Sequence, residues 1–446
     1  MGWRQTKDSE NTVKVHLTAL GCKLNQSEAE SWARRLADAG FDIVDDPAKA
    51  ELSIVNTCTV THVAARKSRQ RVRQCARANP QAHIVVTGCY AEISPQEAAR
   101  LPGVGWVVGT AGKEQLTDRV CAAFGPATAV GPVPRPRPQS GHTRAFVKVQ
   151  DGCDNACTYC IVRVARGRQR SRPIRDILDE ILARQDEGYQ EMVLTGVHIG
   201  AYGREQGQTL AGLVQHVLAH TGFPRLRLSS IEPWDLTPEL LGMWQNPRLC
   251  RHLHLPLQSG CDATLHRMNR RYTTAQYRDL LAAAREAIPD LAVTTDLIVG
   301  FPGEDATEFE ASAAFVTAMA FARLHVFPFS ARQGTAAARM PAQVPATPKK
   351  ERAARMAQIG QASAVSFRRR FVGRTMDVLW ERCRSGRWNG LTGNYIRVWA
   401  VSSQPLANRI LPARLTEVIE HGMRGQLAVT TDQGPDDGVR AHPAEG

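Results

Sequence analysis

Six short apolar runs recur between residues 144 and 348, and a helical stretch follows each of them. They read AFVKVQ, EMVLTG, LRLSS, HLHLPL, AVTTDLIVG and RLHVFPF. Strands that alternate with helices in this way are typical of parallel sheets. A closed barrel of eight such units usually takes about 250 residues, which is more than this region contains. The spacing therefore predicts a partial barrel of six β/α units, which we place at residues 144–365.

A shorter region of the same kind precedes this one. The runs VKVHLTAL, ELSIVNT, HIVVTG and GWVV alternate with polar helical stretches, and they predict a small open α/β domain over residues 12–124. The segment GPVPRPRP follows. Because proline cannot continue a helix or a central strand, we expect a linker at residues 125–143.

The pattern changes after a long basic helix at residues 349–370. The runs TMDVLWE, YIRVWAV and ARLTEVIEH are separated by Gly and Asn turns, which predicts a small all-β barrel over residues 366–431. Residues 432–446 are polar, with Gly and Pro, and predict a disordered tail. The expected fold class is thus α/β, with an open α/β domain, a partial (β/α)6 barrel and a small all-β barrel in that order.

Composition narrows the range of functions. Lys and Arg number 56 against 43 Asp and Glu, and the resulting net charge of +13 favours a polyanionic partner. No apolar run is long enough for a membrane helix, and residues 1–11 lack the apolar centre of a signal peptide, so we expect a cytoplasmic protein without membrane contact. Eleven cysteines in such a chain indicate metal or redox chemistry rather than disulfides.

The densest cysteine motif is CDNACTYC, directly after the first run of the predicted barrel. Thiolates hold iron–sulfur clusters, and a [4Fe-4S] cluster needs four ligands. Three cysteines therefore leave one iron open to a small molecule with amino and carboxylate groups. A structural zinc site needs four protein ligands, and no fourth Cys or His pair lies nearby. We expect Cys153, Cys157 and Cys160 to be catalytic cluster ligands.

A second set of three cysteines lies in the predicted N-terminal domain. Cys22, Cys58 and Cys89 each follow the end of a predicted strand. In an open α/β sheet ligands gather beyond the carboxyl ends of the strands, so these thiols are candidates for a second cluster. From position alone, inert buried thiols remain an alternative. We interpret the remaining cysteines as structural, namely Cys75, Cys121, Cys250, Cys261 and Cys383.

The CxxxCxxC loop after the first barrel strand resembles that of the radical S-adenosylmethionine superfamily. The order LGCxxN, NTC, GC, CxxxCxxC and a small β-barrel is similar to the methylthiotransferase family over almost the whole chain. The resemblance implies two [4Fe-4S] clusters, one for radical generation and an auxiliary one, at Cys22, Cys58 and Cys89, for sulfur. It implies S-adenosylmethionine as radical source and methyl donor, and a one-electron reductant such as flavodoxin or ferredoxin. The sulfur donor stays open.

The resemblance also implies cofactor contacts at the ends of three barrel strands. Thr195 and Gly196, in LTGVHIGAYG, are expected to hold the methionine amino group of the cofactor. Gln258 and Ser259, in HLPLQSG, and Asp296, in DLIVGFPGE, are expected near the cofactor, with a structural role at the barrel rim as the alternative. Two further polar residues at strand ends are weaker candidates, His198 and Glu232.

Basic and aromatic residues indicate an RNA partner. Arginines recur at helical spacing after Cys58, which favours phosphate binding, at Arg66, Arg69, Arg73 and Arg77. The segment VRVARGRQRSRP places six more arginines after the CxxxCxxC motif, at Arg163, Arg166, Arg168, Arg170, Arg172 and Arg175. The C-terminal module looks like a TRAM domain, an RNA-binding barrel, in which Trp388 and Tyr395 would stack on bases if exposed.

The family offers two substrate classes, adenosine 37 beside the tRNA anticodon and an aspartate of a ribosomal protein. The basic surface favours the anticodon loop of tRNA. Enzymes that act on isopentenyl-adenosine commonly carry Gln-Met after the first cysteine, whereas this chain has Cys22-Lys23-Leu24-Asn25-Gln26. The chain thus resembles the branch that methylthiolates C2 of N6-threonylcarbamoyladenosine, giving 2-methylthio-N6-threonylcarbamoyladenosine. The alternatives are N6-isopentenyladenosine 37 and the ribosomal-protein aspartate.

Overall fold

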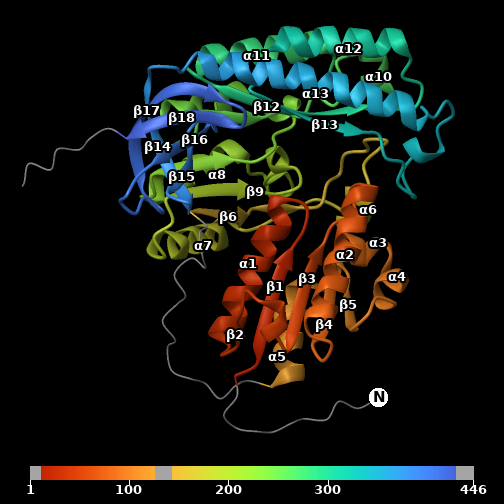
Figure 1. Ribbon diagram of the computed structural model, residues 1–446. Helices are drawn as coiled ribbons and strands as arrows, with labels where there is room; N and C mark the ends of the chain where they lie inside the picture. The colour runs from red at the N-terminus through yellow and green to blue at the C-terminus, as the bar shows by residue number, and fades with distance from the viewer. Residues whose placement is uncertain (1–11, 126–142, 428–446) are drawn as a thin grey trace, which may run out of the picture.

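The computed structural model describes residues 12–125 and 143–427 (Figure 1). The expected tail at residues 432–446 and the expected linker at 125–143, apart from its two end residues, lie outside the described residues. Within the described ranges, no helix is both long and apolar enough to cross a membrane.

The N-terminal region is a parallel sheet covered by helices on both faces. The strand order is β2 (Asp42–Ile43), β1 (Lys14–Ala19), β3 (Leu52–Thr57), β4 (His83–Gly88) and β5 (Val104–Val108). The helices are η1 (Pro47–Lys49), η2 (Thr110–Gln115), α1 (Lys23–Asp38), α2 (His62–Ala78), α3 (Cys89–Ile93), α4 (Pro95–Ala99) and α5 (Leu116–Phe124). Every residue of the central strand β3 is buried, as expected of a strand with helices on both sides. The expected open α/β domain is confirmed.

The central region holds six parallel strands in chain order. They are β6 (Arg144–Lys148), β9 (Glu191–Thr195), β10 (Arg225–Leu228), β11 (His252–His254), β12 (Ala292–Val299) and β13 (Arg323–Pro328). Two single bridges, Leu226 to Leu249 and Ser230 to His254, continue the sheet from β10 toward β11. The strands do not close into a ring among the described residues, so the predicted partial barrel is confirmed.

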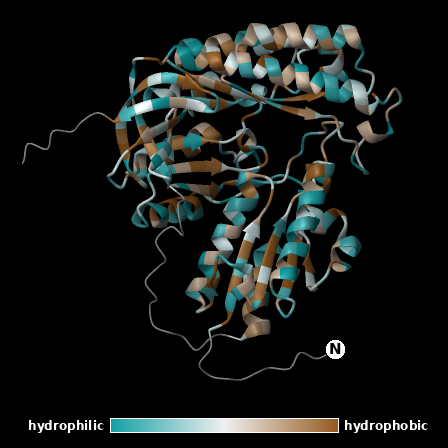
Figure 2. Ribbon diagram, in the orientation of Figure 1, coloured by the Kyte–Doolittle hydropathy of each residue, from teal (hydrophilic) through white to brown (hydrophobic). Residues whose placement is uncertain are grey.

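Helices surround the outside of this partial barrel (Figures 1 and 2). The α-helices are α6 (Val162–Arg166), α7 (Ile174–Asp186), α8 (Leu210–His220), α9 (Pro238–Gly242), α10 (Asp262–Arg267), α11 (Thr274–Ala287), α12 (Ala306–Met319) and α13 (Ala346–Arg369). Short 3-10 turns are η4 (Ile199–Ala201), η5 (Arg204–Gln206), η6 (Pro233–Asp235), η7 (Met243–Gln245) and η8 (Ala337–Arg339), and β7 (Gln150–Asp151) pairs with β8 (Arg170–Ser171). The brown strands in Figure 2 carry apolar side chains toward these helices.

The C-terminal region is a closed five-stranded barrel of the TRAM type. Its strand order is β14 (Thr375–Arg384), β15 (Arg387–Thr392), β16 (Arg397–Val401), β18 (Gly422–Leu427) and β17 (Ile410–Ile419). It covers the amino ends of the central strands, where Arg225 donates hydrogen bonds to the carbonyls of Leu391 (3.0 Å) and Asp377 (2.8 Å). The carboxyl ends of those strands stay free for the cysteine loops.

Candidate cluster sites and the barrel interior

The loop between β7 and α6 places three thiols together beyond the carboxyl end of β6. Burial, with the charges of Cys157 and Cys153 nearby, raises the pKa of the Cys160 thiol to about 12, although the backbone N–H of Val162 opposes this. Burial also raises the pKa of Cys157. Thiols that lie close enough to repel each other as thiolates suit a cation that binds them together and displaces their protons. The donor set therefore fits an iron–sulfur cluster with three protein ligands.

Two polar side chains stand directly behind these thiols. The Nδ1 atom of His198 lies 3.9 Å from Cys153 Sγ, and its Nε2 atom is hydrogen-bonded to Asp235. Burial lowers the pKa of His198, but the hydrogen bonds to Asp235 and Cys153 outweigh it and raise the pKa to about 9. Arg270 donates to Cys157 Sγ (3.4 Å) and pairs with Glu232.

The two weaker candidates, His198 and Glu232, thus lie beside the cluster ligands rather than among them. His198 contacts a thiol directly, whereas Glu232 acts through the buried Arg270. Sequence reasoning missed Arg270 and Asp235, because nothing in their local sequence distinguishes them from structural residues. Hydrogen bonds to thiolates lower the electron density on sulfur, and such contacts tune a cluster.

The second trio gathers at the carboxyl edge of the N-terminal sheet. Cys22 precedes α1, Cys58 follows β3, and Cys89 begins α3. Burial, with the charges of Cys22 and Cys89, raises the pKa of Cys58 to about 11, despite a hydrogen bond from a backbone N–H. Gly21 has φ +96°, and a Cβ there would lie 2.7 Å from Cys58 Sγ, so only glycine lets the two loops approach. The arrangement fits a second three-thiolate site.

One buried arginine, Arg166, connects the segment after the CxxxCxxC motif to the second trio. Arg166 is 4% exposed and donates to Glu28 Oε1 (3.1 Å), Asp151 Oδ1 (2.9 Å) and Asn25 Oδ1 (2.5 Å). Its charge acts on the thiols of Cys22 and Cys89. The next residue, Gly167, accepts a hydrogen bond from the Cys153 N–H at 3.2 Å. The segment after the CxxxCxxC motif therefore touches both thiol groups.

This position corrects one expectation from the sequence. The sequence places Arg166 among the basic residues that indicate an RNA partner, but Arg166 is buried in an ionic network. Arg172 is also drawn inward and pairs with Glu180 Oε2 at 2.6 Å. The others of that segment are exposed, at Arg163, Arg168, Arg170 and Arg175.

The expected cofactor contacts lie at the carboxyl ends of the strands, in different settings. Thr195 is 2% exposed, and a Cβ on Gly196 would lie 2.8 Å from the Gln150 carbonyl, so Gly196 permits close packing. Gln258 has φ 65°, an unusual value for a residue with a side chain, and its carboxamide has no partner among the described residues. Such strain often marks a binding site. Ser259 is buried and accepts a hydrogen bond from Cys261.

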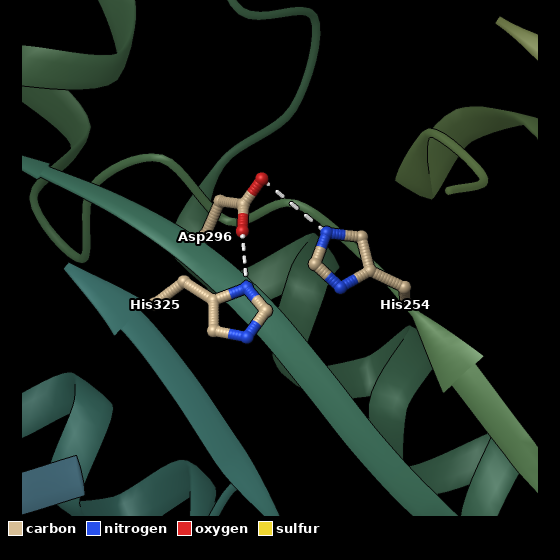
Figure 3. Close-up of side chains that lie close together, drawn as sticks. All are labelled: His254, Asp296 and His325. Atoms are coloured by element: carbon tan, nitrogen blue, oxygen red, sulfur yellow. Dashed lines mark hydrogen bonds and ion pairs between the residues drawn. The ribbon is translucent and has the colours of Figure 1, made fainter. Parts of the chain in front are cut away.

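Asp296 belongs to a group that joins three strands (Figure 3). Its carboxylate lies 3.3 Å from His254 Nε2 and 3.1 Å from His325 Nδ1. Burial opposes ionisation, but hydrogen bonds from the two imidazoles hold the pKa of Asp296 well below its usual range. Sequence reasoning missed His325, although it lies directly opposite Asp296 in the parallel pairing of β12 and β13.

The two aromatic residues expected to stack on RNA pack against other parts of the protein. Trp388 is 9% exposed and packs in the core of the C-terminal barrel. Tyr395 is half-buried, and its ring stacks on His252 with centroids 4.6 Å apart. The expectation of base stacking by these two residues is therefore wrong.

Three of the four arginines in the stripe on α2 are exposed, namely Arg66, Arg73 and Arg77. Arg69 is half-buried, where it pairs with Glu97 at 3.5 Å and lies over the Tyr90 ring. The helix begins four residues after Cys58, so its charge lies beside the second thiol group.

Comparison with known proteins agrees with this organisation. Residues 14–109 match "Uncharacterized protein family UPF0004", and residues 147–316 match the Radical SAM superfamily. The chain is 39% identical to the threonylcarbamoyladenosine tRNA methylthiotransferase MtaB of Thermotoga maritima, over 82% of this chain and 86% of that protein. It is 36% identical to the protein of that name in Bacillus subtilis, over 91% and 93% of the two chains.

A relative with another named substrate is slightly less similar. The tRNA-2-methylthio-N(6)-dimethylallyladenosine synthase of Moorella thermoacetica is 34% identical over 94% of this chain and 99% of that protein. Among solved structures, the radical S-adenosylmethionine methyltransferase TsrM of Kitasatospora setae shares the fold, with a TM-score of 0.53 and 16% identity over 71% and 73% of the chains. The chain belongs to the methylthiotransferase family of radical S-adenosylmethionine enzymes.

Proposed function

We propose that this protein is a tRNA methylthiotransferase that converts N6-threonylcarbamoyladenosine 37 to its 2-methylthio derivative. The observation that carries the proposal is the pair of three-thiol groups that one segment connects, since Arg166 acts on Cys22 and Cys89 and the next residue, Gly167, accepts a hydrogen bond from Cys153 N–H. One group serves radical formation and the other serves sulfur transfer. The relatives with the highest identities named above carry this substrate in their names.

The residues divide between the two clusters and the cofactor. Cys153, Cys157 and Cys160 hold one [4Fe-4S] cluster, and Cys22, Cys58 and Cys89 hold the other. When bound, the clusters and S-adenosylmethionine supply the radical, the sulfur and the methyl group.

The surrounding side chains position these groups. Arg270 donates a hydrogen bond to Cys157 Sγ, and His198 Nδ1 lies 3.9 Å from Cys153 Sγ. The backbone at Thr195 and Gly196, with Gln258 and Ser259, forms the cofactor side of the barrel mouth.

Partners follow from the same assignment. The anticodon loop binds along the arginine stripe of α2, and a flipped loop base reaches the barrel interior at low cost because it is not paired. A one-electron reductant such as flavodoxin or ferredoxin delivers electrons in the cytoplasm.

Nucleosides from total tRNA test the substrate. In cells that lack this gene, 2-methylthio-N6-threonylcarbamoyladenosine disappears and N6-threonylcarbamoyladenosine accumulates, as measured by mass spectrometry of digested tRNA. Complementation with the intact gene restores the product. Loss of the methylthio-isopentenyl nucleoside instead would assign the sister substrate, and an unchanged tRNA profile would point to ribosomal protein.

Charge reversal on α2 tests the RNA surface. The double change Arg66→Glu and Arg73→Glu weakens tRNA binding, and the slope of log affinity against log salt falls by about 2, because each phosphate contact contributes about one. The control is Arg278→Glu, an exposed position on α11, a helix that lies well apart from α2 (Figure 1). Equal losses for both variants, measured by fluorescence anisotropy, would contradict a specific role for α2.

A further inference from the structure

The barrel strands are apolar on the outside and polar on the inside. On β12, Val293, Leu297 and Val299 pack in the core shared with the outer helices. Because side chains alternate along a strand, Asp296 faces the interior. The same alternation directs several other polar side chains inward, namely Glu191, Arg227, His252, His254 and His325. The described interior is thus suited to a polar ligand.

The His254–Asp296–His325 group lies one level below the cysteine loop. Ile298, the next inward residue of β12, packs with Tyr159 of that loop against one small apolar cluster. At the other end of β12, Ala292 packs in the core of the C-terminal barrel. The Asp296 side chain keeps 29% of its surface exposed, so it is accessible to a ligand that enters the barrel.

Lys23 adds a positive charge to this interior. Its Nζ atom lies 5.9 Å from the centroid of the Tyr395 ring, which in turn stacks on His252. Lys23 has no acidic partner among the described residues, whereas Arg227 is paired with Glu191 at 2.7 Å. Burial, and then the charges of Arg227 and Lys23, hold the pKa of His252 well below its usual range.

A threonylcarbamoyl group matches these features. It carries a carboxylate, a hydroxyl and carbamoyl N–H groups, whereas an isopentenyl group carries none of them. Leaving buried polar groups without partners is unfavourable, so a site with these side chains selects a polar substituent over a hydrocarbon. N6 and C2 lie on the same edge of adenine. A side chain held at Lys23, next to Cys22, therefore brings C2 toward the second thiol group.

We propose that Lys23 and the His254–Asp296–His325 group bind the N6 side chain of the target adenosine, Lys23 pairing with its carboxylate and Asp296 accepting hydrogen bonds from its hydroxyl. This inference rests on the proposed function. Lys23 and Asp296 are then specificity-determining residues, and the neighbouring imidazoles position the Asp296 carboxylate.

A double-mutant-type cycle, in which both the enzyme and the substrate are changed, tests the contact between Lys23 and the threonyl carboxylate. The substrates are a synthetic anticodon stem–loop with N6-threonylcarbamoyladenosine 37 and the same stem–loop with its threonyl carboxylate as the methyl ester. On the wild-type holoenzyme the ester lowers kcat/KM by about 10- to 100-fold, the loss expected when one partner of a charged contact is removed. Lys23→Met suffers a similar loss on the acid and no longer distinguishes it from the ester.

A matched pair tests Asp296. A stem–loop with 2-aminobutyrate in place of threonine lacks the hydroxyl. The wild-type enzyme has a lower kcat/KM for this stem–loop than for the threonine form, whereas Asp296→Asn has the same kcat/KM for both. The exposed residues Lys49 and Asp279 supply the control variants Lys49→Met and Asp279→Asn, which keep wild-type discrimination. Iron content and 5′-deoxyadenosine formation without RNA stay at wild-type levels in Lys49→Met and Asp279→Asn.

The outcomes separate the two proposals. If the wild-type enzyme does not methylthiolate the threonylcarbamoyl stem–loop, the proposed function fails. If it does so but treats acid and ester alike, or if Lys23→Met keeps the wild-type ratio between them, the inference about the N6 side chain is overturned and the function stands.

Discussion

Holoenzyme carrying Cys157→Ala forms no 5′-deoxyadenosine from S-adenosylmethionine and dithionite. Cys157 is the middle ligand of its loop and the thiol that Arg270 contacts, and two thiolates do not retain a cluster that needs a fixed third ligand. Iron falls from about eight to about four atoms per chain, because the trio at Cys22 is untouched. After anaerobic reconstitution, an iron assay and chromatography of the reaction mixture measure these two quantities.

The matched control for this change is Cys383→Ala. Cys383 is exposed on β14 of the C-terminal barrel, far in sequence from either trio. The Cys383→Ala variant keeps the full iron content and cleaves S-adenosylmethionine as the wild type does. Undiminished 5′-deoxyadenosine formation in Cys157→Ala would refute the assignment of the radical cluster to this loop.

Glu28→Gln destabilises the protein by about 3–5 kcal/mol, because it leaves buried cations without their counter-charge. Glu28 is 6% exposed and accepts hydrogen bonds from Lys113 Nζ (2.5 Å) and from Arg166 at 3.1 Å. The comparison is Glu310→Gln, which breaks an exposed pair with Arg355 and leaves the free energy of unfolding nearly unchanged. Urea unfolding followed by circular dichroism measures both.

The destabilisation caused by Glu28→Gln decreases as the pH falls. Burial opposes ionisation of Glu28, but the charges of Lys113, Arg166 and Lys148 hold its pKa well below the usual range. A depressed folded pKa contributes stability that is present above the unfolded value and is lost as the pH falls. The difference between wild type and Glu28→Gln therefore shrinks below about pH 4.3. A difference that is constant down to pH 3 would contradict the ionised buried pair.

The sequence predicts those features that depend on local pattern. Apolar runs mark the strands, and cysteines at strand ends come together because the carboxyl ends of parallel strands share one edge. The sequence does not predict which charges are buried. Arg166 and Arg168 lie in one basic segment, yet only Arg166 meets Glu28 from a distant helix. Tyr395 likewise points toward the central barrel, where its ring stacks on His252, and the local sequence does not predict this contact.

His325 shows a second limit of the sequence. Its importance comes from register, because Asp296 lies directly across the strand pair, and register is set by tertiary packing. Lys23 is visible in the sequence next to Cys22. Its missing acidic partner becomes apparent only when the barrel interior is assembled.

The buried network around Arg166 also limits movement between the N-terminal domain and the barrel. It ties the N-terminal domain to the barrel through Glu28, Asp151 and Asn25 with almost no solvent between them. Separating the two regions would expose several paired charges at once, so we expect them to move as one unit. Under the proposed function the target base then has to leave its stack to reach the barrel interior, which favours an unpaired loop base.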